Sequence, residues 1–310
     1  MPSGLMDAPS RPAEAALDRL ITRLHERGRP RVWSLVITVF GDAVVPRGGR
    51  VALQALQDIM GRLRIEAGAL RTAMSRLAAD HWVTRERDGR NSFYRLAEEG
   101  RHAFDLATRR IYAAGPPAWD GAWTVAIAAQ ASDGDLPQKM EEAGFLRVEG
   151  RVYLRPGDIS AAAAGSGDAA AIAAGELAGM LVIHGSSAEH PEAMRMLWPS
   201  EEVIAAYGAF IEAYRPLRNG LKRSGAFRPL DAVAARTLLL HDWRRIVLRD
   251  PGLPPALLPK DWPGEEARSL ARDIYGRLAG PSEAWLTGAG LPPLARPNEF
   301  AGRFGMGGRL

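Results

Sequence analysis

Apolar residues in the first third of the chain recur every three or four positions, which is the period of an amphipathic helix. They predict an accessory helix that ends before Gly28, and then two helices joined by a short charged link at residues 64–66. The apolar positions of these three helices are Leu17, Leu20, Ile21 and Leu24, then Val51, Leu53, Leu56, Ile59, Met60 and Leu63, and then Leu70, Met74 and Leu77. The run at residues 33–40 is apolar nearly throughout, so its periodicity allows either a buried helix or a strand.

Short strands are predicted after the second helix of the pair. Residues 83–86 and 93–96 flank the sequence RDGRN, in which the Asp-Gly pair is a strong signal for a tight hairpin turn because the turn requires positive φ angles. A further helix is predicted over residues 97–113, before a Gly and two prolines that mark a domain boundary. Two helices with a tight turn followed by a hairpin have the order of a winged helix-turn-helix.

Beyond residue 117 the pattern predicts a small α+β domain, which we interpret as ferredoxin-like. Its expected strands lie at residues 123–129, 148–154 and 180–184, and its expected helices at 136–143 and 169–178. From Glu201 onward the pattern is mostly helical, over residues 203–214, 231–248 and 265–278. The expected fold class is therefore α+β, with an N-terminal winged helix-turn-helix, a middle ferredoxin-like domain and a mostly α-helical C-terminal domain.

The corresponding segments are an N-terminal arm with a short helix at 1–28, a winged-helix domain at 29–113, a ferredoxin-like domain at 118–195 and a helical domain at 196–310. Such a division suits the length of the chain, because domains typically comprise roughly 100–200 residues.

Charge adds a functional asymmetry to this division. The sequence pI is near 9.7, yet the positive excess is local: residues 1–112 carry 19 arginines against 13 acidic residues, and residues 113–310 carry 21 basic against 23 acidic residues. Such an asymmetry is expected if one domain meets phosphate. The chain has no cysteine, which excludes disulfides and thiolate metal sites and favours a cytoplasmic protein. We expect no membrane span, because Asp168 and Glu176 interrupt the most apolar stretch.

The second helix of the predicted pair has two chemically different faces. At 100° per residue, the apolar positions lie on one side, and the other side carries polar side chains that suit base edges and phosphates: Arg71, Thr72, Ser75 and Arg76. Arginines that suit phosphate contacts cluster around the predicted hairpin: Arg85, Arg87, Arg90 and Arg95. We interpret the two sets as a DNA-binding surface. The alternatives are an ordinary solvated helix face and a winged helix that binds protein.

Three segments of the first 113 residues resemble the N-terminal region of the PaaX family, repressors of phenylacetate catabolism: SLVITVFGDAVVPRGGRVALQAL, LRTAMSRLAADHWVTRERDGRNSFYRL and EEGRHAFDLATRRIYA. The segment ARTLLLHDWRRIVLRDPGLPPALLPKDWPG resembles the C-terminal domain of that family. The resemblance implies the three-domain order given above, with a middle domain akin to a small CRISPR-associated nuclease. It also implies a homodimeric repressor that an aryl-CoA thioester, phenylacetyl-CoA in the founding case, releases from a double-stranded DNA operator.

The middle domain departs from the family pattern in its first helix. After the first strand the family tends to have a basic, Arg-spaced helix, whereas this chain has Lys139 beside two glutamates. We assign effector binding and dimerisation to residues 196–310. Candidate effector-binding residues are His241, Arg244 and Arg245, because arginine offers a planar donor fork to a CoA phosphate. The alternative, which we favour, is an ion-pair network that holds the turn RDPGLPP.

Enzymatic motifs are largely missing, and we predict neither an enzyme nor a bound cofactor. Neither a G-x-S-x-G sequence nor a phosphate-binding G-x-x-x-x-G-K-[ST] loop occurs in the chain. His184 and His190 lack further ligands at metal-binding spacing. The alternative function is a metal-dependent nuclease in the middle domain, for which Asp133 or Asp135 is the candidate carboxylate.

Overall fold

The structure is a computed structural model that describes residues 12–26, 28–89, 91–116, 118–130, 134–157, 177–186, 201–223, 227–250 and 252–307. It combines helices with two small antiparallel sheets, which confirms the α+β class. Contacts divide the chain into two compact units: unit 1 comprises Met1–Gly115, Ala206–Leu248 and Pro263–Leu310, and unit 2 comprises Pro116–Ala205 and Arg249–Trp262. Packing therefore groups C-terminal helices with the N-terminal elements, and the predicted three-domain boundaries stay predictions.

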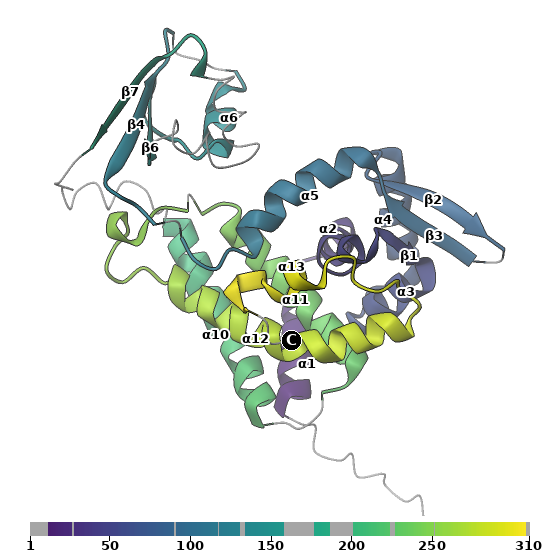
Figure 1. Ribbon diagram of the computed structural model, residues 1–310. Helices are drawn as coiled ribbons and strands as arrows, with labels where there is room; N and C mark the ends of the chain where they lie inside the picture. Colours follow the sequence, from purple (N-terminus) through teal and green to yellow (C-terminus); the bar gives the residue numbers. More distant parts are fainter. Residues whose placement is uncertain are drawn as a thin grey trace, which may run out of the picture. The chain divides into compact units, whose positions relative to one another are not determined.

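Unit 1 is built around one long, almost wholly buried helix. This helix, α11, packs against α12, α1, α2, α3 and α5, so that segments far apart in the sequence lie side by side (Figure 1). The longer helices of the unit are α1 (Pro12–Glu26), α2 (Val32–Val39), α3 (Leu53–Arg62), α4 (Ala67–Ala79), α5 (Glu98–Ile111), α10 (Glu201–Arg223), α11 (Pro229–Val247) and α12 (Gly264–Gly288). The first five residues of α10 belong to unit 2. The short ones are α13 (Pro297–Ala301) and the 3₁₀ turn η4 (Arg303–Gly305). None of the described helices is long and apolar enough to cross a membrane.

The apolar run near residue 33, which periodicity left open, is helical. Helix α2 continues directly into a π-helical turn, η1 (Phe40–Val44), and then into the 3₁₀ turn η2 (Val45–Arg47). Nearly every side chain from Ser34 to Val44 is buried, which explains why the run lacks an amphipathic period. The wider π turn brings Asp42 to the interior.

Helices α3 and α4 and the hairpin of strands β2 (Val83–Asp88) and β3 (Asn91–Leu96) confirm the element order predicted for this region. A third strand, β1 (Arg50–Ala52), completes a sheet of order β1-β3-β2 and was missed. The strand follows Gly48 and Gly49, both with positive φ. The prediction of Val51 as part of the following helix was wrong: Val51 lies in β1 and the helix begins at Leu53, and a strand of three residues has no measurable alternation.

Unit 2 holds a four-stranded antiparallel sheet of order β5-β6-β4-β7 with one short described helix. Its elements are β4 (Ala122–Ile127), α6 (Leu136–Glu142), β5 (Leu146–Glu149), β6 (Val152–Pro156), β7 (Leu181–Ser186) and the 3₁₀ turn η3 (Pro255–Leu257). The prediction of one strand at residues 148–154 was wrong. Gly150, at φ 50°, starts a turn there, and the segment forms the hairpin of β5 and β6. The helix predicted at residues 169–178 lies almost entirely outside the described residues.

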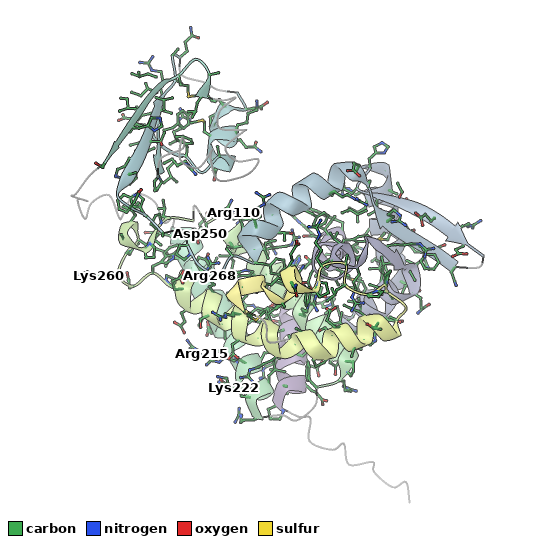
Figure 2. The ribbon with its side chains drawn as sticks, in the orientation of Figure 1. Arg110, Arg215, Lys222, Asp250, Lys260 and Arg268 are labelled. Carbon is green, nitrogen blue, oxygen red and sulfur yellow. The ribbon has the colours of Figure 1, made fainter. Side chains whose placement is uncertain are left out.

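Two arginines attach the end of α5 to the C-terminal helices of unit 1. Arg110 donates to the carbonyl of Val247 at 3.1 Å, and Arg268 on α12 donates to the carbonyl of Ala113, also at 3.1 Å (Figure 2). The Arg268 guanidinium also lies 5.5 Å from the centre of the Trp243 ring. These contacts fix the C-terminal end of α5 against α11 and α12.

A buried ionic network centres on Asp42. Its Oδ2 lies 2.5 Å from Nε of Arg236 on α11, and its Oδ1 accepts hydrogen bonds from Arg303 at 2.8 Å, from Tyr112 at 2.7 Å and from Tyr275 at 3.0 Å. Burial alone would raise the pKa of the Asp42 carboxyl, but the charges of Arg236 and Arg303 and the hydrogen bonds outweigh burial, so the pKa is lowered.

A second carboxylate extends this network to the segment before β1. Glu283 on α12 binds Arg236 through Oε1 at 2.6 Å and Arg47 through Oε2 at 2.7 Å. The Arg47 guanidinium also donates to the carbonyl of Pro292 at 2.5 Å. Two carboxylates and three guanidiniums thus join α11 and α12 to the turns that follow α2.

Replacing Asp42 with Asn should lower the free energy of unfolding by about 3–5 kcal/mol, because it leaves buried guanidiniums without their carboxylate. Urea unfolding at pH 7, followed by circular dichroism, measures the loss. The matched control is Asp58→Asn, an exposed carboxylate on α3 that accepts a hydrogen bond from Gln54; it should cost under about 0.5 kcal/mol. A loss below about 1 kcal/mol for Asp42→Asn would contradict the role assigned to this carboxylate.

The lowered pKa of Asp42 also predicts the pH range in which its contribution is lost. A carboxyl whose pKa is lower in the folded state stabilises the fold above the pKa of the unfolded chain, 3.8, and loses this effect as the pH falls through the folded value. The stability difference between the wild type and Asp42→Asn should stay constant above about pH 5 and shrink below about pH 4.

Candidate nucleic-acid interface

Helix α4 presents the polar face that its sequence predicted. All four side chains expected to contact DNA are exposed: Arg71, Thr72, Ser75 and Arg76. The opposite side is buried in unit 1 through Leu70, Ala73, Met74 and Leu77. Apolar spacing alone therefore orients this helix, and its burial leaves the polar face open to a ligand.

The donors on this face are largely uncommitted. The Thr72 hydroxyl donates to the carbonyl of Gly68 at 3.1 Å, and the Arg76 guanidinium lies 3.7 Å from an Asp80 oxygen, with both side chains more than half exposed. Within the described part of the chain, Arg71 makes neither an ion pair nor a hydrogen bond through its side chain. A planar guanidinium in this position can offer a bidentate fork to a base edge or a phosphate.

The β2–β3 hairpin separates the arginines that the sequence grouped together. Its pairing runs from Val83 opposite Leu96 to Asp88 opposite Asn91, and side chains alternate between the two faces. Arg85 stands opposite Tyr94 and Arg87 opposite Ser92, so both lie on the face that also carries the buried Val83 and Leu96. Arg95 stands opposite Thr84, on the other face. Arg90 lies outside the described residues.

Arg95 is held by a carboxylate on its own face of the sheet. Glu86 accepts hydrogen bonds from Arg95 Nε at 2.8 Å and from Arg50 Nε at 3.0 Å. These two hydrogen bonds lower the pKa of the Glu86 carboxyl, and the hydrogen bond from Arg95 has the larger effect. The positive charge of Arg95 is therefore compensated locally, whereas Arg87 has no ion pair among the described residues.

Arg50 is a residue that the sequence reasoning missed. It stands on β1 opposite Arg95, and its guanidinium lies 3.6 Å from the centre of the Phe93 ring. The only sequence signal was a basic residue directly after two glycines, which is typical of a loop. Its place beside Glu86 depends on the pairing of β1 with β3, whose partner residues lie 41 to 45 positions further along the chain.

The candidate effector residues lie on α11 but do not all face the same way. Arg245 is exposed, whereas His241 is buried and Arg244 is partly buried. Arg244 donates from Nε to the hydroxyl of Thr38 at 2.9 Å, and His241 Nδ1 lies 3.5 Å from the same oxygen. Arg244 Nη2 also donates to the hydroxyl of Ser34 at 2.6 Å and to its carbonyl at 3.0 Å. The structure thus brings two of the three residues together at α2.

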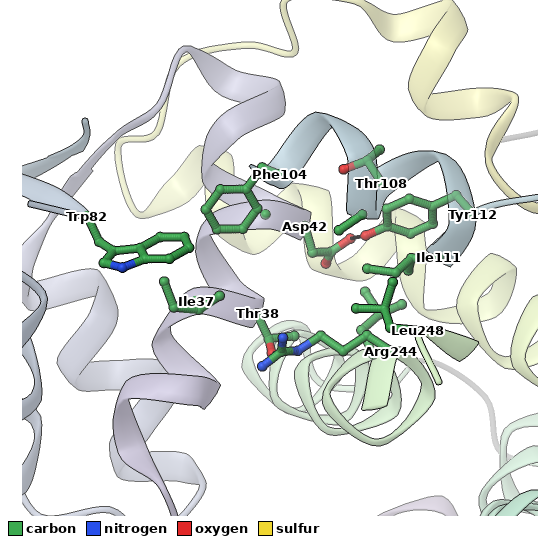
Figure 3. A pocket seen from close by; sticks show the side chains of 13 residues that line it. Ile37, Thr38, Asp42, Trp82, Phe104, Thr108, Ile111, Tyr112, Arg244 and Leu248 are labelled. Carbon is green, nitrogen blue, oxygen red and sulfur yellow. Dashed lines mark hydrogen bonds between the residues drawn. The ribbon is translucent and has the colours of Figure 1, made fainter. Parts of the chain in front are cut away.

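A cavity of about 140 Å³ lies beside Arg244, within unit 1 (Figure 3). Aromatic and aliphatic side chains from α2, α5 and α11, together with one from the link between α4 and β2, form most of its wall: Trp82, Phe104, Tyr112, Ile37, Ile111 and Leu248. Burial, followed by the neighbouring charge of Arg245, lowers the pKa of Arg244. The cavity therefore combines an apolar wall with a partly desolvated cation.

The structure describes only some of the residues considered for nuclease or metal chemistry. Asp133 lies outside the described residues, and Asp135 directly precedes α6 without a side-chain cap. His184 lies on β7, with its Nδ1 3.4 Å from the Thr124 hydroxyl, and His190 is not among the described residues. In the part of the chain that the structure describes, no three His, Asp or Glu side chains gather as a metal site would require.

Comparisons with known proteins agree on one family. The model of the PaaX-like protein family matches residues 31–100, and that of the PaaX-like protein C-terminal domain matches residues 198–288. Over 265 residues, 83% of each chain, the sequence is 31% identical to the transcriptional repressor PaaX of Escherichia coli strain K12. The uncharacterized protein Rv0674 of Mycobacterium tuberculosis aligns over 76% of this chain and 91% of its own with a TM-score of 0.45 and 20% identity, a likeness too distant to carry an argument.

Replacing Arg95 with Gln should raise the pKa of Glu86 toward its ordinary value, because the first of its two hydrogen-bond donors is lost. A carboxyl NMR titration of the two proteins measures the change. The matched control is Arg87→Gln, on the other face of the hairpin, which should leave the Glu86 pKa unchanged. If both variants titrate like the wild type, the two-faced arrangement of the hairpin is wrong.

Proposed function

Since this chain belongs to the PaaX family, we propose that it is a transcriptional repressor that binds double-stranded operator DNA. The observation that carries the proposal is the exposed polar face of α4, with two arginines whose side chains are not buried in the fold. The name of the Escherichia coli relative supports repression as the biological outcome. The excess of arginine in residues 1–112 supports a nucleic-acid partner for this part of the chain.

In the proposed complex, α3, α4 and the sheet β1-β3-β2 act as a winged helix-turn-helix. Helix α4 enters the major groove, where Arg71 and Arg76 read guanine edges and Thr72 and Ser75 contact bases or phosphates. Arg85 and Arg87 contact the backbone from the hairpin, together with Arg90. We assign Arg95 a weaker contribution than the sequence alone suggested, because Glu86 compensates its charge.

The proposal extends to a homodimer and to an effector. A dimer would place two α4 helices about 34–36 Å apart, or a multiple of this distance, on a pseudo-palindromic operator. The family resemblance supports control of an aromatic-acid, phenylacetate-type operon and release by an aryl-CoA thioester, with His241, Arg244 and Arg245 as candidate contacts. The strand order of unit 2, together with α6 between β4 and β5, supports a ferredoxin-like domain.

Replacing Arg71 or Arg76 with Ala should weaken operator binding by about 1–3 kcal/mol and relax sequence preference, because each loses a bidentate base contact. Gel shifts on the region upstream of the protein's own operon, with a matched non-operator fragment, measure both effects. The control is Arg223→Ala, an exposed arginine at the end of α10, outside the proposed interface. Unchanged affinity in both α4 variants would overturn the assignment of α4 as the reading helix.

The hairpin predicts a difference between two arginines of the same strand pair. Replacing Arg87 with Gln should reduce the slope of log affinity against log salt concentration by about 1, on operator and non-operator DNA alike, because one phosphate contact is lost. Replacing Arg95 with Gln should change the slope by less than half as much, since Glu86 already compensates this guanidinium. Equal slopes for the two variants would contradict the division of the hairpin into two faces.

A further inference from the structure

The cavity beside Arg244 has the volume of one small ring. An engineered protein cavity of about 150 Å³ binds benzene, and this one measures about 140 Å³. Coenzyme A carries a nucleotide and a pantetheine arm, so at most the acyl end of a thioester fits in this volume. The part of a ligand that lies inside this cavity is therefore about the size of one ring with few further atoms.

Aromatic side chains dominate one side of the cavity. Trp82 and Phe104 meet edge to face with ring centres 6.3 Å apart, and Tyr112 lines the same space (Figure 3). Ile37 and Leu248 add aliphatic surface. An aromatic ring is the ligand group that gains most from such a wall, because it can pack edge to face as well as lose its hydration.

The charges that line the cavity are not balanced. Asp42 and Arg244 are its two charged lining residues, and the Asp42 oxygens are already bound by Arg236, Arg303 and two tyrosines. Arg244 donates to the neutral oxygens of Thr38 and Ser34, and among the described residues no carboxylate forms an ion pair with it. A guanidinium that is partly removed from water and has no counter-ion favours the binding of a ligand with an anionic oxygen.

We propose that this cavity binds a small monocyclic aromatic carboxylate, with the ring among Trp82, Phe104 and Tyr112 and the carboxylate on Arg244. The acid is a ligand in its own right, additional to the thioester effector. Its consequence for DNA binding rests on the proposed function, because Trp82 connects the end of α4 to the start of β2. A ring packed against Trp82 acts on DNA affinity only if it favours one position of the reading helix relative to the hairpin.

Isothermal titration of the full chain tests the site, with benzoate and phenylacetate as probes and benzyl alcohol as the neutral analogue. At least one acid should bind, and benzyl alcohol should bind at least tenfold more weakly. Arg244→Gln should weaken binding of the acid at least tenfold, while the matched variant Arg223→Gln, an exposed arginine at the end of α10 that does not line the cavity, should stay within twofold of the wild type.

A second variant tests the proposal even if Arg244→Gln does not fold. Ala107 lines the cavity from α5, and Ala107→Leu should abolish acid binding by filling the space without changing any charge. Circular dichroism and thermal unfolding verify that each variant is folded. The proposal would be overturned if neither acid binds, including the case in which phenylacetyl-CoA binds and the free acids do not. It would also be overturned if acid and alcohol bind equally well, or if folded Ala107→Leu binds the acid as well as the wild type does.

Gel shifts with and without the acid separate this inference from the proposed function. A change in operator affinity that is absent in Arg244→Gln supports the coupling through Trp82. If the acid binds and operator affinity is unchanged, the site stands and the coupling is overturned. A protein that binds the acid but no DNA would overturn the proposed function and leave the cavity assignment supported.

Discussion

The carboxylate of Asp42 is the point on which the packing of unit 1 depends. It lies in the π turn after α2 and is bound by Arg236 of α11, by Arg303 near the C-terminus, by Tyr112 after α5 and by Tyr275 of α12. Elements that are up to 261 residues apart thus converge on one buried group. Such an arrangement tolerates little displacement, because a buried charge that loses its partner is strongly destabilising.

This constraint connects the packing of unit 1 to its proposed activity. The same turn that carries Asp42 follows α2, which packs against α4 and α11. The cavity lies where α2, α5 and α11 meet, and Trp82 at its edge leads from α4 into the hairpin. The elements proposed to bind DNA and the proposed ligand cavity therefore lie in the same unit, so a ligand that changes the position of Trp82 would act close to the proposed reading helix.

Local patterns predicted the parts of this frame that depend on local chemistry. The polar face of α4 followed from apolar spacing, and the hairpin from an Asp-Gly turn. What depends on distant partners was not predictable: Arg236 lies 194 residues from Asp42, and no spacing rule connects them. The same reason explains why Arg95 was grouped with the other hairpin arginines, since Glu86 and Arg50 meet it only after three strands have paired. The β5–β6 hairpin was predicted as one strand because alternation continues across Gly150.

Hydroxyl-radical footprinting of the purified protein on the region upstream of its own operon tests the central claim, sequence-specific binding by α4, most directly. If paired α4 helices occupy successive major grooves, protection should appear as short stretches that repeat with the helical period of about 10–10.5 base pairs, at one position in the fragment, and should persist in excess non-operator DNA. Uniform protection that disappears with added salt or competitor, or no protection at any protein concentration, would contradict the claim.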